Sequence, residues 1–133
     1  MDIRDRIATA LLALRLGVFV VMLVWTIDKF LNVEHAAGVF QGFYGLGGLG
    51  RGTLLVVGGV ELLIVLAFVL GYRKRLSYGL VFALHAVSTL SSYRQYLDPF
   101  NNLLFFAAWP MLAGCFALYL LRDLDTRWTI DRA

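Results

Sequence analysis

Apolar residues fall into four long blocks separated by short polar stretches. The blocks cover about residues 8–30, 53–71, 77–97 and 102–121. Each block approaches the roughly 20 apolar residues that a helix needs to cross about 30 Å of hydrocarbon. None alternates with the period of two typical of barrel strands, and only helices or closed barrels satisfy the backbone in lipid. The pattern therefore predicts an all-α integral membrane protein, a four-helix bundle with antiparallel up-down topology.

The connections between the blocks predict one membrane domain over residues 1–133. Only the connection 31–51 is long. We expect its first part, Val33 to Tyr44, to form a short amphipathic helix lying in the membrane interface. Its second part matches G-x-G-x-x-G at residues 45–50, but no strand precedes it, so the context of a nucleotide-binding motif is missing. We predict a flexible outer loop there. Within the fourth block, Pro110 predicts a kink, because proline removes a backbone donor.

The distribution of basic residues predicts the orientation of the chain. Arginine and lysine near the ends of spans are retained on the cytoplasmic side of the membrane. With four spans, the three basic clusters all lie on one side, so we predict that both termini are cytoplasmic. Lys29, Arg51 and Arg94 lie near the opposite side and weaken the pattern. The clusters are Arg4 and Arg6; Arg73, Lys74 and Arg75; and Arg122, Arg127 and Arg132.

The amino-acid composition limits the kinds of ligand and chemistry that the chain can support. The chain is 60% hydrophobic and 16% charged, and its net charge of +3 is spread between the apolar blocks. We therefore predict contact with the lipid bilayer and no nucleic-acid binding. The single cysteine, Cys115, excludes an intramolecular disulfide and a cysteine metal cage. Neither His35 nor His85 has a second histidine or a cysteine at metal-ligand spacing, so we predict no metal site.

Two ionisable residues lie deep within the apolar blocks. Glu61 and His85 are each about eight residues from a span end, which places both near the midplane at about 1.5 Å per residue. A charge at that depth costs at least about 2.5–3.5 kcal/mol, so such residues face the bundle interior and are candidates for function. We expect the two side chains to meet and to form a proton-exchanging, catalytic pair. The alternative interpretation is a structural hydrogen bond of order 1 kcal/mol between two helices.

The third block carries further polar residues on the helix face of His85. Ser88 and Ser92 belong to this stripe and are candidate ligand-binding residues. Alternatively, such small hydroxyl residues permit close helix packing and bond to the preceding turn. The complete stripe is His85, Ser88, Thr89, Ser92, Gln95 and Tyr96.

The first block places Trp25 and Lys29 on the same face as Arg15. Trp25 and Lys29 are candidates for contacting a ligand. Arg15 lies about two turns inside the inner edge, and we expect its long side chain to reach back to the lipid headgroups. Asp28 and Lys29 either anchor the outer end of the helix in the interface beside Trp25 or pair across the bundle, for instance with Arg94.

Four short motifs resemble the DoxX-like family of small four-helix membrane proteins. They are Arg15-Leu16-Gly17; Trp25-Thr26-Ile27-Asp28-Lys29-Phe30; Gly59-Val60-Glu61-Leu62-Leu63; and Gly71-Tyr72-Arg73. The resemblance implies a protein of the bacterial inner membrane, in some cases a subunit or accessory of quinone-linked oxidoreductases such as thiosulfate:quinone oxidoreductase. It also implies that Lys29 and Glu61, and more weakly Arg15, are polar residues of the bundle. The Gly-Lys that often ends the family's first span is Asp28-Lys29 here.

Three functional hypotheses follow. The first is a redox-associated, quinone-linked membrane subunit, in which Glu61 and His85 exchange protons with a quinone held by Trp25, Lys29, Ser88 and Ser92. A protonatable group must then lie within hydrogen-bond reach of the quinone oxygen, and a partner redox protein supplies the electrons. The second is a non-catalytic assembly or scaffold protein that docks a partner through residues 31–51 and the C-terminal tail. The third, solute transport, requires a homo-oligomer.

Overall fold

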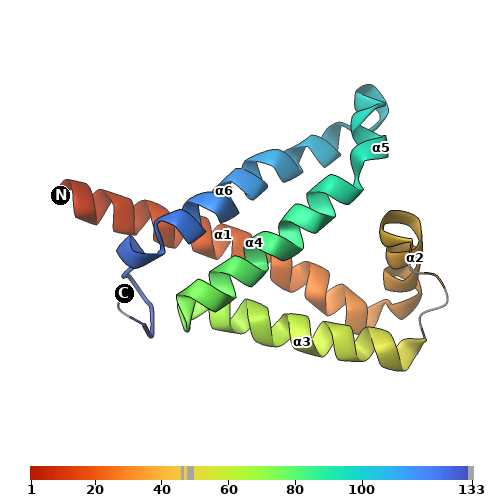
Figure 1. Ribbon diagram of the computed structural model, residues 1–133, viewed down its shortest axis with the longest axis horizontal. Coiled ribbons are helices and arrows are strands. Elements are labelled where there is room, and N and C mark those ends of the chain that lie inside the picture. The colour runs from red at the N-terminus through yellow and green to blue at the C-terminus, as the bar shows by residue number, and fades with distance from the viewer. Residues whose placement is uncertain (46, 48–49, 132–133) are drawn as a thin grey trace.

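The computed structural model describes residues 1–45, 47 and 50–131, and within them every regular element is a helix. This confirms the all-α prediction for the described residues. Four long helices run back and forth (Figure 1): α1 (Ile3–Leu31), α3 (Arg51–Val69), α4 (Lys74–Ser91) and α6 (Ala108–Leu120). The shorter elements are α2 (Val33–Tyr44), α5 (Tyr93–Tyr96) and the 3₁₀ turns η1 (Pro99–Asn101), η2 (Leu103–Ala107) and η3 (Arg122–Leu124).

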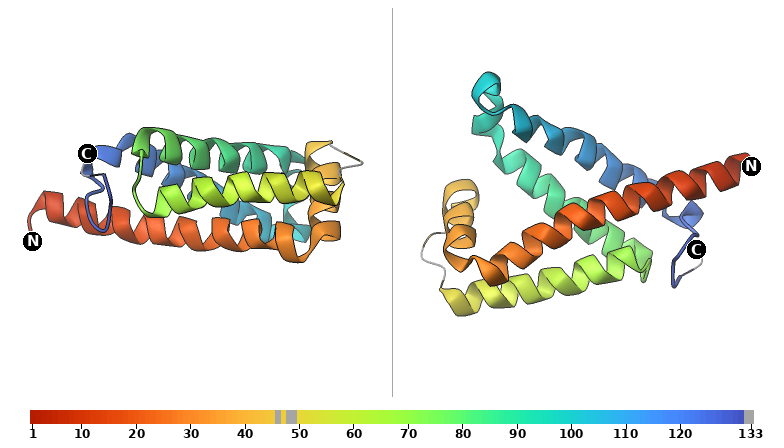
Figure 2. Two further views of the ribbon diagram at one scale, coloured as in Figure 1. Left: turned by 90° about the horizontal axis from the view of Figure 1, so that it is seen from below. Right: turned by 180° about the vertical axis from the view of Figure 1, so that it is seen from behind.

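Each long helix contacts two others, so that the four form a ring, but two pairs of helices diverge at one end. α1 contacts α3, α3 contacts α4, α4 contacts α6, and α6 returns to α1. Towards the end that carries α2 and α5, the pair α4 and α6 diverges from the pair α1 and α3 (Figures 1 and 2). α2 lies in this opening, where it contacts α1, α3 and α4. The N-terminus, the α3–α4 turn and the C-terminal tail gather at the other end (Figure 1).

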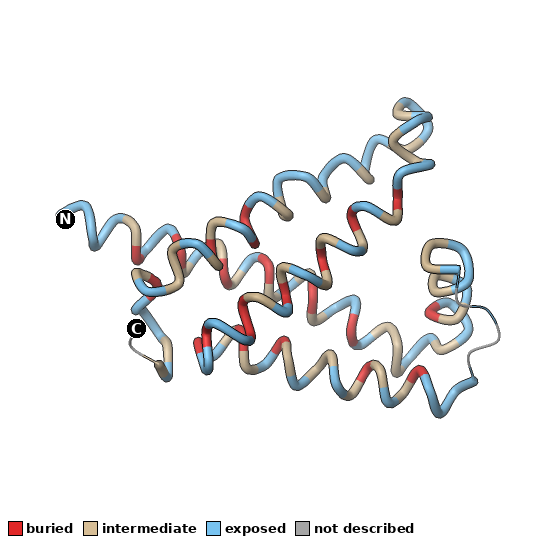
Figure 3. The backbone as a smooth tube through the Cα atoms, viewed as in Figure 1, coloured by how far each residue is buried: buried red, intermediate tan, exposed pale blue. Residues whose placement is uncertain are grey.

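Among the described residues, three helical segments are long and apolar enough to cross a membrane: Ile3–Leu31, Arg51–Val69 and Leu103–Leu120. Their outward surfaces are apolar, with Val24 59%, Leu63 71% and Phe116 50% exposed. The buried positions, red in Figure 3, include several residues with polar side chains, such as Arg15, Thr26 and His85. This distribution is the inverse of that of a water-soluble protein and indicates a membrane protein.

Helix α4 differs from these three because it is rich in polar residues. It starts with Lys74 and Arg75 and also holds histidine, serine and threonine, so it does not reach the hydropathy of a membrane span. Its polar residues are nevertheless turned inwards: Tyr78, His85 and Thr89 are each about 1% exposed. Apart from Arg75 in its first turn, its exposed positions are apolar, among them Leu76, Leu80, Val87 and Leu90.

The ends of two predicted spans differ from the sequence pattern. The third block was expected to be one helix over 77–97, but α4 ends at Ser91 and a separate turn of helix, α5, follows. Pro110 was expected to kink a continuous helix. Instead α6 begins at Ala108, so Pro110 lies in its first turn, where the backbone nitrogen needs no helical partner. The residues before it form the 3₁₀ turn η2.

The connection 31–51 contains the predicted helix with the predicted bounds, α2 at Val33–Tyr44. It ends at Gly45, whose φ of 68° is left-handed and favours glycine. Of the glycine-rich loop predicted after it, residues 46 and 48–49 lie outside the described residues.

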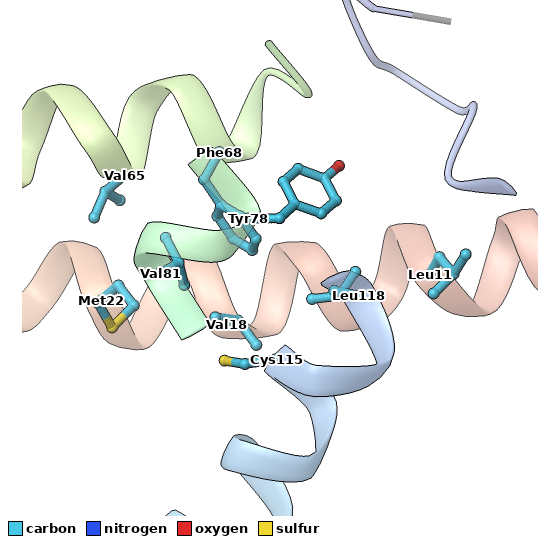
Figure 4. Close-up of a cluster of buried hydrophobic side chains, with 9 residues drawn as sticks. All are labelled: Leu11, Val18, Met22, Val65, Phe68, Tyr78, Val81, Cys115 and Leu118. Atoms are coloured by element: carbon cyan, nitrogen blue, oxygen red, sulfur yellow. The ribbon is translucent and has the colours of Figure 1, made fainter. Parts of the chain in front are cut away.

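The apolar core lies where all four long helices converge (Figure 4). α6 approaches α1 closely at Gly114, where an added Cβ would come within 3.0 Å of a methyl carbon of Leu14. The aromatic ring of Phe68 packs edge-on against Tyr78 at a centroid distance of 5.1 Å. The cluster comprises Leu11, Val18, Met22, Val65, Phe68, Tyr78, Val81, Cys115 and Leu118.

Candidate functional site

Glu61 forms an ion pair with Lys29 across the contact between α1 and α3. The Lys29 ammonium lies 2.8 Å from Glu61 Oε2, and the side chains are 13% and 16% exposed. The Thr26 hydroxyl lies 3.0 Å from the same oxygen. Thr26 and Lys29 are three residues apart, so they share one face of α1 and reach the same carboxylate. Of the two alternatives for Lys29, the structure shows pairing within the bundle and not anchoring in the membrane interface, because the ammonium group is turned into the protein.

His85 lies on α4 and is 1% exposed. Its Nε2 is 3.0 Å from the carbonyl oxygen of Ala108 at the start of α6. A carbonyl can only accept, so Nε2 carries the proton and Nδ1 of the neutral ring carries a lone pair. Nδ1 is buried and has no hydrogen-bond partner among the described residues. His85 thus offers a free basic nitrogen, and the indole of Trp25 stacks on its ring at 6.0 Å.

The expected contact between Glu61 and His85 is not formed. The hydrogen bonds of Glu61 go to α1, and those of His85 go to α6 and to its own helix. The physical reason is the nearer opposite charge: Lys29 compensates the carboxylate more fully than a neutral imidazole could. The two residues instead line the same cavity.

That cavity, which we call the polar cavity, has a volume of about 430 Å³ and lies between α1, α2, α3 and α4. Lys29 and Glu61 line it from one side, and His85 and Ser88 line it from α4. Most of the remaining lining is apolar or aromatic: Met22, Trp25, Val39, Phe40, Tyr44, Val57, Leu80, Ala83, Leu84 and Val87.

A second cavity of about 660 Å³, with no charged residue in its lining, lies between α1, α4 and α6. Trp25, His85 and Ser88 line both cavities and so form their common wall. Ser92 lines only the second one, and its hydroxyl donates to the carbonyl of Ser88 at 3.2 Å. All four residues predicted to contact a ligand, Trp25, Lys29, Ser88 and Ser92, therefore line a cavity.

Only part of the polar stripe predicted for the third block lies on one continuous helix face. The hydroxyl of Thr89 donates to the His85 carbonyl one turn earlier at 2.7 Å, which is the structural alternative considered from the sequence. Tyr96 belongs to α5 and donates back to the Thr89 carbonyl at 2.8 Å. The stripe ends as a continuous face where α4 ends, at Ser91.

A second polar cluster, at the opposite end of the molecule, was not predicted. Arg15 and Asp125 are both completely buried, with Nη1 of the arginine 2.5 Å from Oδ1 of the aspartate. Tyr78 donates to the other carboxylate oxygen at 2.6 Å, and the Lys74 ammonium donates to the Asp125 backbone carbonyl at 2.6 Å. The cluster ties α1, α4 and the segment after α6 together.

The expectation that Arg15 reaches the headgroups is wrong. Its Nη2 donates to the backbone carbonyls of Arg127 and Trp128, at 2.6 and 3.2 Å, so the guanidinium is enclosed by the C-terminal tail. The sequence did contain a signal for this ion pair, namely an arginine within an apolar block, because a buried guanidinium requires an anionic partner. Several aspartates lie near that end of the chain, so the sequence could not single out Asp125.

Asp28 is directed away from this interior. Its carboxylate lies 2.6 Å from Nδ1 of His35 on α2, at a site where the side chains are 30% and 62% exposed. The pair links the end of α1 to the start of α2. It is exposed and contributes little to stability.

The fold and the cavities define a helical membrane protein with a polar site between its helices. Comparison of the chain with protein-family models, with curated proteins and with solved structures gave no match.

Proposed function

We propose that the chain crosses the bacterial inner membrane four times, with both termini in the cytoplasm, and that it is a DoxX-like protein. Its three long apolar segments support this, together with the inward polar and outward apolar faces of α4. The N-terminus, the α3–α4 turn and the tail share one end of the molecule, and the basic clusters belong to these segments (Figure 1). The other end, with α2 and α5, is then periplasmic.

We further propose that the protein is a redox-associated, quinone-linked membrane subunit. The observation that carries this proposal is the polar cavity, in which Lys29 and Glu61 face the same space as His85. A planar carbonyl compound of the membrane fits a site with an aromatic and apolar lining and a few polar groups. Nδ1 of His85 accepts no hydrogen bond from the described residues, and the hydroxyl group of a quinol can donate one to it.

The residues of the cavity have distinct roles in this proposal. The Lys29 ammonium donates a hydrogen bond to a carbonyl oxygen of the quinone and favours its negative charge on reduction. When the quinol is oxidised, His85 Nδ1 accepts one hydroxyl proton and the Glu61 carboxylate accepts the other. The two electrons pass to a partner redox protein. The bound quinone supplies the electron chemistry, and the chain supplies binding, orientation and proton transfer.

The experiment is a thermal-unfolding measurement on purified protein in mild detergent, with and without a short-chain ubiquinone. Wild-type protein should be stabilised in proportion to quinone concentration. Glu61→Gln should lose this stabilisation, whereas the control Glu34→Gln, an exposed carboxylate on α2, should keep it. If Glu61→Gln responds to quinone as the wild type does, the carboxylate is a structural tie and the assembly or scaffold hypothesis is favoured.

A further inference from the structure

The end of the molecule that the proposed orientation places in the cytoplasm, an orientation on which this inference rests, holds a third cavity that the proposed quinone site does not use. It has a volume of about 430 Å³ and is lined by four cationic residues, two acidic residues and one leucine. The residues come from the start of α4 and from the segments that follow α6. They are Arg73, Lys74, Arg75, Leu76, Arg122, Asp123 and Asp131.

In this basic cavity Arg122 is held in place by contacts that leave some of its donors free. Nη1 of Arg122 donates to the Tyr119 carbonyl at 2.8 Å, and its guanidinium lies 4.6 Å from the centre of the Tyr119 ring. The remaining guanidinium donors stay available, since an arginine has five. Arg75 is exposed and has no recorded partner among the described residues. Two arginines from different segments can therefore reach the same anion.

The two acidic residues, Asp123 and Asp131, cancel only part of this charge, because four cations and two carboxylates leave a formal charge of +2. Asp131 accepts a hydrogen bond from the backbone nitrogen of Arg73 at 2.5 Å, so its carboxylate is committed to the α3–α4 turn. Lys74 points inwards to the Asp125 carbonyl. Arg73, Arg75 and Arg122 keep guanidinium donors beyond the bonds that Arg73 makes to Tyr72 and Arg122 makes to Tyr119, and with the net positive charge this favours an anionic ligand.

The position of the cavity indicates which anion binds. Leu76 lines the cavity and is 58% exposed, and Leu80, one turn further along α4, is 37% exposed. The basic cavity therefore continues directly into the apolar outer face of α4. A molecule with a phosphate and an attached hydrocarbon chain matches both parts, whereas a free phosphate matches only the first.

We propose that the basic cavity binds the headgroup of an anionic phospholipid of the inner leaflet, with an acyl chain lying along Leu76 and Leu80. Basic pockets on the cytoplasmic side of membrane helices bind such headgroups, and each arginine near the surface contributes about 1 kcal/mol, or roughly fivefold in affinity. The ligand fixes the start of α4 and the C-terminal segments relative to the bilayer.

The test is lipid binding to the full-length protein in mild detergent, measured by native mass spectrometry with phosphatidylglycerol, phosphatidylcholine and glycerol 3-phosphate. Wild-type protein should prefer phosphatidylglycerol to phosphatidylcholine, and glycerol 3-phosphate should compete poorly. Arg75→Gln should weaken phosphatidylglycerol binding roughly fivefold and Arg75→Gln with Arg122→Gln roughly 25-fold. Because the Arg75 side chain makes no hydrogen bond or ion pair with the residues that the structure describes, the single variant should fold normally, as circular dichroism would check.

The matched control is Arg51→Gln with Arg94→Gln, which removes two exposed arginines from the other end of the molecule. This control should retain phosphatidylglycerol binding. Equal losses in both double variants would mean non-specific attraction and would overturn the site. Effective competition by glycerol 3-phosphate would mean a site for free anions and would overturn the lipid assignment.

Discussion

Arg15 and Asp125 lie 110 positions apart in the chain and form a fully buried ion pair, 2.5 Å between Nη1 and Oδ1. Each carboxylate oxygen has a partner, because Tyr78 donates to Oδ2. The arginine also donates to two carbonyls of the tail through Nη2. The pair therefore connects the segment after α6 to α1, and its removal should lower the free energy of unfolding.

Asp125→Asn should destabilise the protein by about 3–5 kcal/mol, because it leaves the Arg15 charge buried without compensation. The measurement is denaturant or thermal unfolding in detergent, followed by circular dichroism. The control is Asp5→Asn, whose contact with Arg127 is 3.6 Å long and about half exposed. It should change stability by less than about 0.5 kcal/mol. Similar losses of stability in the two variants would show that the buried Arg15–Asp125 ion pair contributes no more than the exposed one.

The sequence predicted the helical segments well because lipid-exposed faces must be apolar along their whole length. It predicted the site less well, because pairing between helices depends on their relative rotation and depth. Glu61 and His85 were identified as candidate site residues from their depth within the apolar blocks alone. Their hydrogen-bond partners, however, include Lys29 for Glu61 and Ala108 for His85. Asp125 was missed because it follows an apolar block and looks in the sequence like any residue of a polar tail.

Gly71→Ala should release the C-terminal tail. Gly71 has a φ of 62°, where alanine is strained by about 1–2 kcal/mol, and an added Cβ would lie 2.5 Å from Thr129. The backbone bonds from Ile130 to Leu70 and from Asp131 to Gly71 would then weaken. Limited trypsin digestion should cut after Arg127 faster than in the wild type.

The control for this change is Gly52→Ala near the start of α3, where an added Cβ meets nothing within 4 Å. It should leave tail cleavage unchanged and stabilise the helix by up to about 1 kcal/mol. Wild-type cleavage kinetics in Gly71→Ala would show that the turn does not hold the tail.

His85→Phe should separate the stability role of the imidazole from its proposed role in binding. Phenylalanine keeps an aromatic ring against Trp25 and removes the bond to the Ala108 carbonyl, so the stability loss should be about 1 kcal/mol. Stabilisation by a short-chain ubiquinone should disappear, since the free Nδ1 is gone. Thr89→Val, next to the ring but outside both cavity linings, should retain the response to quinone. Retention of that response in His85→Phe would remove the imidazole from the site.

Lys29 and Glu61 should be energetically coupled. We expect Lys29→Met and Glu61→Gln each to destabilise the protein and the double variant to be less destabilised than the sum. The expected coupling is about 1 kcal/mol, typical of polar pairs between membrane helices. Unfolding free energies of the four proteins give this value. Strict additivity would mean that the 2.8 Å contact contributes no stability.

The proposed orientation predicts which positions a membrane-impermeant thiol reagent can reach. Cys115 is buried in the apolar core, so a Cys115→Ala background removes the one native thiol without placing a hydroxyl there. In whole cells with a permeabilised outer membrane, Glu34→Cys and Asn101→Cys should be labelled, because α2 and η1 lie at the periplasmic end. Arg4→Cys and Arg75→Cys should be labelled only after the inner membrane is opened, because retained basic clusters face the cytoplasm. Labelling of all four in intact cells, or the reverse pattern, would contradict the proposed orientation. The reverse pattern would also place the basic cavity in the outer leaflet.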